Sequence, residues 1–344
     1  MTIRNTCRTL SDSLAAHPIG CVPRPLIDKS SQVLALGSCF ALRVKEWLLA
    51  NRYQVLNEGD LPPQVIAGRQ EFDPRIYYNT FCIRYEFERL AGEFVQEPDE
   101  VWEPHQTLSK IWQDPYRRML AATDRQALWA RIAAVDRQMN AHIRSANLVI
   151  ITLGLTEVFF QQHNGRAICA APGYAGGGGF GCEFRATEYQ ENFDNIDTVV
   201  RILGQVNPQA QVVLTVSPVP LGSTFAGTDH AIANTESKSI LRAVAGAITR
   251  RYSNVHYFHS YELVMHAARH DVFLEDGRHV KPDYVAGIMR DFELAFVKPE
   301  AAGTVKPQIP TVPQSAAAIA TRPKRGPHFI EIASPAPTSS GLRG

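Results

Sequence analysis

The sequence lacks long apolar runs, and this absence excludes one class of protein at once. No stretch of the 344 residues approaches the roughly 18 consecutive apolar residues that cross a bilayer. The first seven residues, Met-Thr-Ile-Arg-Asn-Thr-Cys, also lack the basic start and continuous apolar core of a signal peptide. We therefore expect a cytoplasmic location and no membrane partner.

Cysteine and net charge are also low, and each shortage excludes further functions. The six cysteines are scattered and form no Cys-x-x-Cys pair, which argues against a disulfide framework and against structural zinc. Histidine pairs at 256/259 and 266/270 have the spacing of helical metal ligands, but neither has a complete set of partners. The net charge of +1 gives no general basic surface for nucleic acid. We expect no metal, no cofactor and no nucleic-acid partner.

Apolar and amphipathic segments alternate through the middle of the chain. Buried-strand patterns begin near residues 33, 53, 146, 211 and 255, and helical patterns lie between them. This alternation predicts an α/β fold with a mainly parallel sheet. Residues 1–30 read as an extended lead-in and 31–298 as the folded domain. From 299 to 344 the composition shifts to Pro, Ala, Thr, Ser and Gly, which predicts a largely disordered tail.

The segment at residues 33–41 gives the first indication of a site. Its apolar run breaks at Gly37 and Ser38, and the residues that follow have apolar side chains at helical spacing. We interpret it as a buried strand, a tight turn carrying Ser38, and a helix. A hydroxyl there lies beside backbone N–H groups that stabilise negative charge, which suits a nucleophile. Serine is also a preferred N-cap, so this segment by itself favours a helix cap.

Further polar residues follow other predicted elements. The apolar run that begins at 146 ends in Gly154, Thr156 and Glu157, and ligands of open parallel sheets bind at the carboxyl ends of strands. Asn79 precedes a predicted helix at 80–91, where it either caps that helix or faces the same pocket as Ser38.

A carboxylate lies three residues before an imidazole near the end of the folded region, at Asp276 and His279. An Asp that holds one ring nitrogen leaves the other free to take a serine proton. Asp-x-x-His is common in loops and alone predicts an exposed turn. The combination is stronger, because Ser38, the polar turn after residue 153 and this pair all fall on one edge of the expected sheet.

This order of elements resembles the SGNH (GDSL-like) hydrolases, and Gly-Ser-Cys-Phe-Ala at residues 37–41 resembles the motif that names one branch, the GSCFA family. Four further blocks similar to that family follow in order, at residues 152–157, 215–220, 237–241 and 276–280. Together the blocks cover about residues 17–297, which makes 31–298 a GSCFA-like domain.

The resemblance implies a flavodoxin-like three-layer α/β/α sandwich with an esterase or acyltransferase site. Ser38 would be the nucleophile, His279 the general base and Asp276 the residue that orients it. The backbone N–H of Ser38 would belong to the oxyanion hole. The candidate oxyanion or substrate-binding residues are Gly37, Cys39, Asn79, Gly154, Thr156, Glu157 and His230.

The sequence departs from the SGNH pattern at the oxyanion hole. Thr156 stands where the superfamily usually has an Asn donor, and loss of one such donor can cost on the order of a hundredfold in rate. Either Thr156 or Asn79 compensates, or the site has another use. Cys39 is expected to pack in the core, and His230 is either a pocket residue or a surface histidine.

Two classes of function remain open. The first is a serine esterase or deacetylase that acts on an acylated, carbohydrate-like small molecule through a Ser-His-Asp site, with an O-acyltransferase as its close variant. The second is a non-catalytic module that binds a carbohydrate or small ligand in the retained pocket. The sequence does not reveal the oligomeric state.

Overall fold

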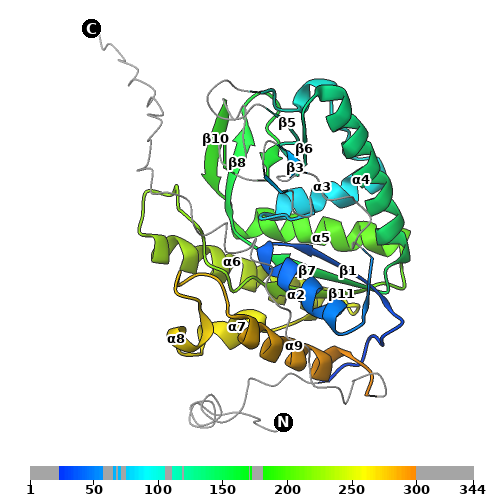
Figure 1. Cartoon of the computed structure of the whole chain (residues 1–344), viewed down its shortest axis with the longest axis vertical. Helices are drawn as coiled ribbons and strands as arrows, with labels where there is room; N and C mark the ends of the chain where they lie inside the picture. Colours follow the sequence, from blue (N-terminus) through cyan, green and yellow to red (C-terminus); the bar gives the residue numbers. More distant parts are fainter. Residues whose placement is uncertain are drawn as a thin grey trace, which may run out of the picture. The chain divides into compact units, whose positions relative to one another are not determined.

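The computed structural model describes residues 23–56, 65–66, 69–70, 75–104, 111–117, 120–169, 171–172 and 181–299 (Figure 1). The chain divides into two units, residues 1–310 and 311–344, and every described residue belongs to the first. Residues 1–22 of the predicted lead-in and 300–344 of the predicted tail lie outside the described residues.

A five-stranded parallel sheet forms the centre of this unit. Its strands are β1 (Gln32–Gly37), β2 (Gln54–Val55), β7 (Leu148–Leu153), β11 (Gln211–Val216) and β12 (Val255–Tyr257). They lie side by side in the order β2-β1-β7-β11-β12, and every neighbouring pair is parallel. Ranked along the chain this is the order 2-1-3-4-5 of the flavodoxin-like fold, so the predicted α/β class is confirmed.

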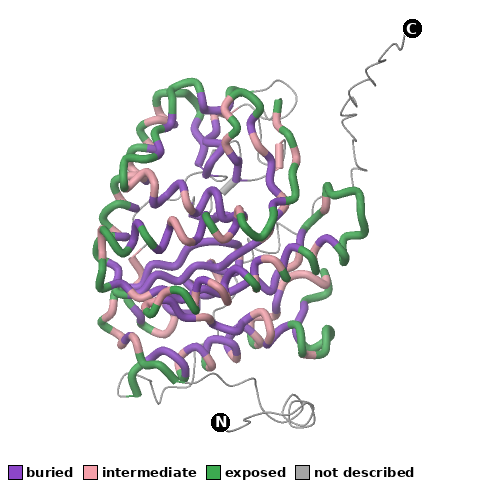
Figure 2. Tube along the Cα trace, turned by 180° about the vertical axis from the view of Figure 1, so that it is seen from behind, coloured by how far each residue is buried: buried purple, intermediate pink, exposed green. Residues whose placement is uncertain are grey.

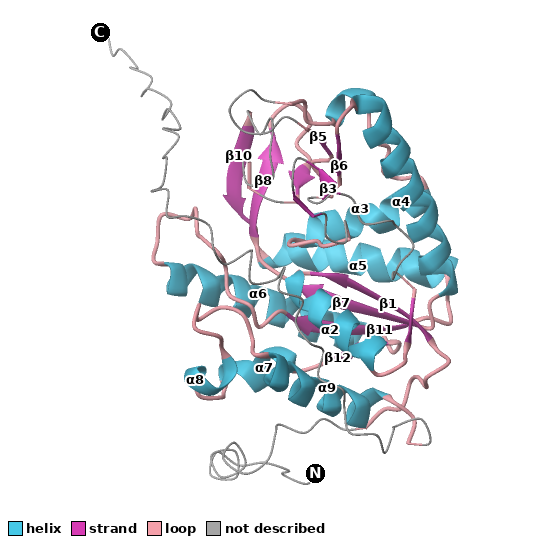
Figure 3. Cartoon of the chain, in the orientation of Figure 1, coloured by secondary structure: helices cyan, strands magenta, loops and turns pink. Residues whose placement is uncertain are grey.

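Helices cover both faces of the sheet, as the parallel pairing requires. One face is covered by α2 (Cys39–Ala50), α7 (Ser260–Met265), α8 (Arg269–Val272) and α9 (Pro282–Phe296). The other is covered by α3 (Thr80–Ala91), α4 (Arg125–Ser145), α5 (Tyr189–Val206) and α6 (His230–Arg251). Figure 3 shows the resulting three layers, with α2 and α9 on one side and α5 on the other.

The strands are apolar on both faces because each face meets a layer of helices. In β1, Leu34 and Leu36 pack with α3, α4, α5 and α6, whereas Val33 and Ala35 pack with α2 and α9. The sheet is therefore the most continuously buried part of the described chain (Figure 2). This arrangement explains why the strands read as unbroken apolar runs in the sequence.

Smaller elements are inserted between the strands of the main sheet. An antiparallel sheet of β8 (Glu157–Gln161), β9 (Ala167–Ile168) and β10 (Cys182–Ala186) follows β7. Two short ribbons pair β3 (Val65–Ile66) with β4 (Arg69–Gln70) and β5 (Trp112–Gln113) with β6 (Ala121–Ala122), and a 3-10 helix, η1, spans Pro98–Glu100. The sequence analysis did not predict β8, which begins at Glu157 directly after the polar turn.

The described part of the lead-in packs against the end of α9. The backbone N–H of Arg24 donates to Ala295 O, and those of Leu26 and Ile27 donate to Phe296 O. No described helix combines the length and the apolar character needed to cross a bilayer. The described cysteines, Cys39, Cys82, Cys169 and Cys182, are all free thiols.

Candidate active site

Ser38 lies on the turn between β1 and α2, where the sequence analysis placed it. Its Oγ accepts a hydrogen bond from Phe40 N at 3.3 Å, which makes it the N-cap of α2, and lies 3.0 Å from Thr152 Oγ1. Gly37 makes the turn possible, because its φ is +118° and a Cβ there would lie 2.2 Å from Thr152 O. The predicted cap is confirmed. Ser38 lies at the carboxyl end of a central strand and is only 2% exposed.

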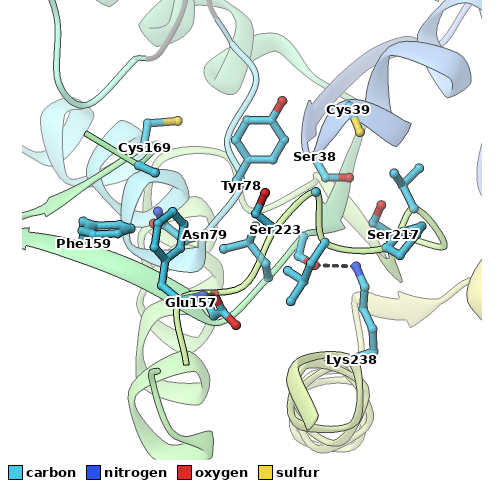
Figure 4. Close-up of a pocket in the computed structure, with 18 of the residues that line it drawn as sticks. Ser38, Cys39, Tyr78, Asn79, Glu157, Phe159, Cys169, Ser217, Ser223 and Lys238 are labelled. Atoms are coloured by element: carbon cyan, nitrogen blue, oxygen red, sulfur yellow. Dashed lines mark hydrogen bonds between the residues drawn. The ribbon is translucent and has the colours of Figure 1, made fainter. Parts of the chain in front are cut away.

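Ser38 also lines a pocket of about 220 Å³ at this edge of the sheet (Figure 4). The apolar walls are formed by Tyr78, Phe159, Ile168, Val219, Leu221 and Phe225. The polar and charged lining includes Glu157, Ser217, Lys238 and Arg278. The pocket is thus a small apolar space with several polar groups at its walls, as expected of a small-molecule site.

The structure brings together half of the residues that the sequence pointed to. Those that line the pocket are Ser38, Cys39, Asn79, Gly154 and Glu157. Those that do not line it are Gly37, Thr156, His230, Asp276 and His279. Cys39 is partly buried and packs against the core that includes α2, while also lining the pocket.

Asp276 and His279 form the expected pair in the loop before α9. His279 Nδ1 lies 2.5 Å from Asp276 Oδ2, and Asp276 Oδ1 accepts the backbone N–H groups of Arg278 and His279 at 2.9 Å. Partial burial alone would raise the pKa of Asp276, but these hydrogen bonds together hold its pKa below the usual value. The carboxylate therefore stays ionised and orients the ring.

This pair lies beside the pocket and does not line it. The side chains of Asp276 and His279 are about one-third exposed, at 32% and 35%. Between them in sequence, Arg278 does line the pocket, and its Nε donates to Pro220 O at 3.3 Å. Ser38 Oγ bonds to Phe40 N and Thr152 Oγ1, and no hydrogen bond joins it to His279.

Two backbone N–H groups near the expected oxyanion hole already have acceptors elsewhere. The N–H of Ser38 donates to Thr152 O at 2.9 Å. The N–H of Thr156 donates to Ser237 Oγ at 2.9 Å, which ties the turn after β7 to α6.

Asn79 is engaged at both ends of its amide. Its Oδ1 accepts from Cys82 N at 2.9 Å and caps α3, as predicted. Its Nδ2 donates to Ile168 O, also at 2.9 Å. Asn79 thus borders the pocket mainly as a residue that joins α3 to β9.

Two other predicted residues hold the loop that closes one side of the pocket. Glu157 accepts hydrogen bonds from Thr224 Oγ1 at 2.6 Å and Phe225 N at 3.0 Å. His230 Nε2 lies 2.6 Å from Leu221 O. Both residues therefore anchor residues 221–225, and Glu157 does so from within the pocket.

Lys238 and Ser217 were not identified as site residues from the sequence. Lys238 is 2% exposed and its Nζ donates to Gly154 O at 2.6 Å. Burial lowers the pKa of the Lys238 ammonium to about 7, the charge of Arg278 acts in the same direction, and Cys39 opposes them. Ser217 follows β11 and is 1% exposed. In the sequence, Ser217 and Lys238 were marked only by lying in the family-like blocks at 215–220 and 237–241, and this position does not indicate a chemical role.

Comparison with known protein families identifies a match over most of the folded domain. The model of the GSCFA family matches residues 32–292, which is most of the chain and includes every pocket residue named above. No curated protein matches the chain. Because the match covers well over half of the sequence, the chain belongs to the GSCFA family.

Proposed function

We propose that this protein is a serine esterase that removes a short acyl group from a small molecule by way of an acyl-enzyme on Ser38. The observation that carries the proposal is the position of Ser38 Oγ, which lines a small, largely apolar pocket at the carboxyl edge of the sheet and the N-terminus of α2. A helix N-terminus favours the negative charge that develops when an ester carbonyl is attacked.

The reaction has two balanced steps. Ser38 Oγ attacks the ester carbonyl, its proton passes to His279 Nε2, and the carbonyl oxygen becomes an oxyanion. The carbonyl then re-forms, the bond to the leaving alcohol breaks, and His279 returns the proton to that alcohol. Water repeats the sequence, which releases the acid and restores Ser38. Asp276 holds Nδ1 of His279, so Nε2 is the atom left to exchange protons.

The base in this proposal reaches Ser38 when substrate is bound. Hydrogen bonds between catalytic groups are often long or absent without ligand and form in the complex. The loop that carries Asp276 and His279 is partly exposed and adjoins the pocket through Arg278. A small rearrangement of this loop is therefore the conformational step that the proposal requires.

The size of the pocket supports a short acyl group. Its volume of about 220 Å³ lies below the roughly 300–1,000 Å³ of sites for drug-sized ligands. The carbohydrate-like alcohol stays a prediction. An O-acyltransferase would follow the same steps with a hydroxyl of the acceptor in place of water, because exclusion of water depends on the closed complex.

The test is covalent labelling by a small fluorophosphonate, followed by intact-protein mass spectrometry. We expect one adduct on the wild-type protein, none on Ser38→Ala, and strongly slowed labelling of His279→Ala. Ser260→Ala is the control, because Ser260 is buried and bonded to Thr215 Oγ1 but does not line the pocket. An unlabelled wild-type protein that also hydrolyses no p-nitrophenyl ester would refute the proposal.

One observation favours the binding module as a second candidate. Ser38 is held by Thr152 and its own helix and makes no hydrogen bond with His279. A binding module predicts that acetylated monosaccharides bind equally to the wild type and to His279→Ala, with no product formed by either. Calorimetry and product analysis on the same samples distinguish the two candidates.

A further inference from the structure

We propose that Lys238 and Ser217 stabilise the oxyanion in this pocket, in place of the donors that the sequence pattern predicts. The inference rests on the proposed function, because an oxyanion forms only if Ser38 attacks a carbonyl. It assigns a catalytic role to Ser217, which directly follows β11, and to Lys238 of α6, neither of which the sequence analysis identified as a site residue.

The strand register places Ser38 and Ser217 on the two sides of the end of β7. The N–H of Ser38 donates to Thr152 O at 2.9 Å, and the N–H of Ser217 donates to Leu153 O at 2.8 Å. Since β7 lies between β1 and β11, the two serines flank the turn that begins at Gly154.

Lys238 reaches the same turn from α6. Its Nζ donates to Gly154 O at 2.6 Å, and a Cβ built on Gly154 would lie 3.3 Å from Ser38 Cβ. Ser38, Ser217 and Lys238 all line the pocket, and Figure 4 shows their side chains converging from three elements on one end of it. The reacting carbonyl of an ester on Ser38 would therefore lie beside both donors.

Ser217 and Lys238 can each donate a further hydrogen bond to a ligand. Ser217 Oγ is buried and makes no hydrogen bond with any residue that the structure describes. Buried hydroxyl groups are nearly always satisfied, which points to a ligand or solvent oxygen in this place. A protonated Lys238 has three hydrogens, and its one described bond is to Gly154 O. By contrast, the backbone N–H of Ser38, which the sequence analysis placed in the oxyanion hole, already has an acceptor.

The charge around Lys238 favours a role in the transition state. No carboxylate among the described residues acts on its charge, and both oxygens of the pocket residue Glu157 bind the 224–225 loop. The charged or titratable groups that face it are Arg278, which disfavours its positive charge, and Cys39, which favours it. Burial lowers the pKa of Lys238 to about 7. An oxyanion supplies the missing counter-charge as it forms, so the attraction is strongest in the transition state.

The experiment measures fluorophosphonate labelling rates and p-nitrophenyl acetate hydrolysis between about pH 6 and pH 9. Loss of one oxyanion donor costs about 10²–10³-fold in rate, so we expect Lys238→Met to lower both rates by that factor. Ser217→Ala should lower them by about tenfold, since a neutral donor contributes less. In the wild type both rates should fall above about pH 7 as Lys238 loses its proton, and Lys238→Met should abolish this fall.

The controls are Lys45→Met and Ser260→Ala, which change a buried lysine and a buried serine outside the pocket. Circular dichroism confirms that each variant is folded. Cys39→Ser should retain the fall above about pH 7, which would show that the fall does not depend on the Cys39 side chain.

Each outcome decides the inference. Wild-type rates in a folded Lys238→Met variant overturn it, and if that variant does not fold, a wild-type rate in Ser217→Ala overturns it. A rate that rises above about pH 7 and requires Lys238 makes the amine a base and also overturns the inference. These results leave the proposed function intact, whereas an unlabelled and inactive wild type refutes that function and this inference together.

Discussion

The two halves of the candidate site differ in how firmly the fold holds them. Ser38, Ser217 and Lys238 are each at most 2% exposed and are attached to a central strand or to a helix packed on the sheet. Asp276 and His279 lie in a loop with about one-third of each side chain exposed. The sheet therefore positions the nucleophile and the proposed oxyanion donors, whereas a loop carries the base.

The difference in burial predicts which half of the site moves when substrate binds. Parallel strands in register determine the spacing of Ser38 and Ser217 before any ligand binds. The loop half keeps its internal geometry through the Asp276–His279 bond, and its partly exposed side chains are less tightly packed than the buried strand ends. We therefore expect substrate binding to rearrange the loop and to leave the strand ends unchanged.

The largest effect should come from the loop half. Asp276→Asn leaves the side-chain shape but removes the charge that sets the His279 tautomer, so p-nitrophenyl ester hydrolysis should fall by about 10³–10⁴-fold. Asp271→Asn is the matched control, because Asp271 is exposed and lies in α8. A loss of less than tenfold would mean that the loop half takes no part in proton transfer.

A change in the strand-end half of the site should lower the reaction rate less than Asp276→Asn does, but still substantially. A Cβ on Gly154 would lie 2.4 Å from Tyr78 O, so Gly154→Ala must shift the turn that separates Ser38 from Lys238. A displacement near 1 Å can cost about 10²-fold, and we expect that loss in the fluorophosphonate labelling rate. Gly204→Ala is the control, since nothing lies within 4 Å of a Cβ there. Equal rates for the two variants would show that the strand ends tolerate movement.

The pH dependence of the free energy of unfolding tests whether the Lys238 amine is buried as fully as the side chains at the strand ends. Its pKa is about 7 in the folded chain, against an ordinary value of 10.5. Between these values the unfolded chain binds a proton that the folded chain does not, so the free energy of unfolding should rise with pH. The increment is about 1 kcal/mol per pH unit from this group. Urea titrations near pH 7.5 and pH 9 should show this rise in the wild type and lose it in Lys238→Met; a rise that persists refutes the assignment.

The smallest effect on catalysis should come from loosening the loop at residues 221–225, which lies next to both halves of the candidate site. Glu157→Gln keeps one acceptor for Thr224 or Phe225 and loses the other, since an amide nitrogen cannot accept an N–H. We expect KM to rise about fivefold, equivalent to about 1 kcal/mol, with little change in kcat. Glu183→Gln, on the exposed part of β10, provides the comparison. A fall in kcat without a change in KM would place Glu157 in the chemistry instead.

Features that depend on residues close together in the chain could be predicted from the sequence. The strand, turn and helix around Ser38 follow from an apolar run, a glycine at positive φ and a serine cap, all within a few residues. The Asn79 cap and the Asp276–His279 pair are also local, because each joins residues three apart. The alternation of strands and helices was sufficient to predict the parallel sheet.

Which polar groups have partners and which face the pocket could be learned only from the folded chain. Thr156 is tied to Ser237, 81 residues away, and Lys238 reaches Gly154 across 84 residues. In the sequence, Lys238 is one more polar residue of an amphipathic helix, and Ser217 is one more polar residue at a strand end. Hydrogen-bond satisfaction and burial are properties of the packed chain, because they depend on groups that meet only when the sheet has formed.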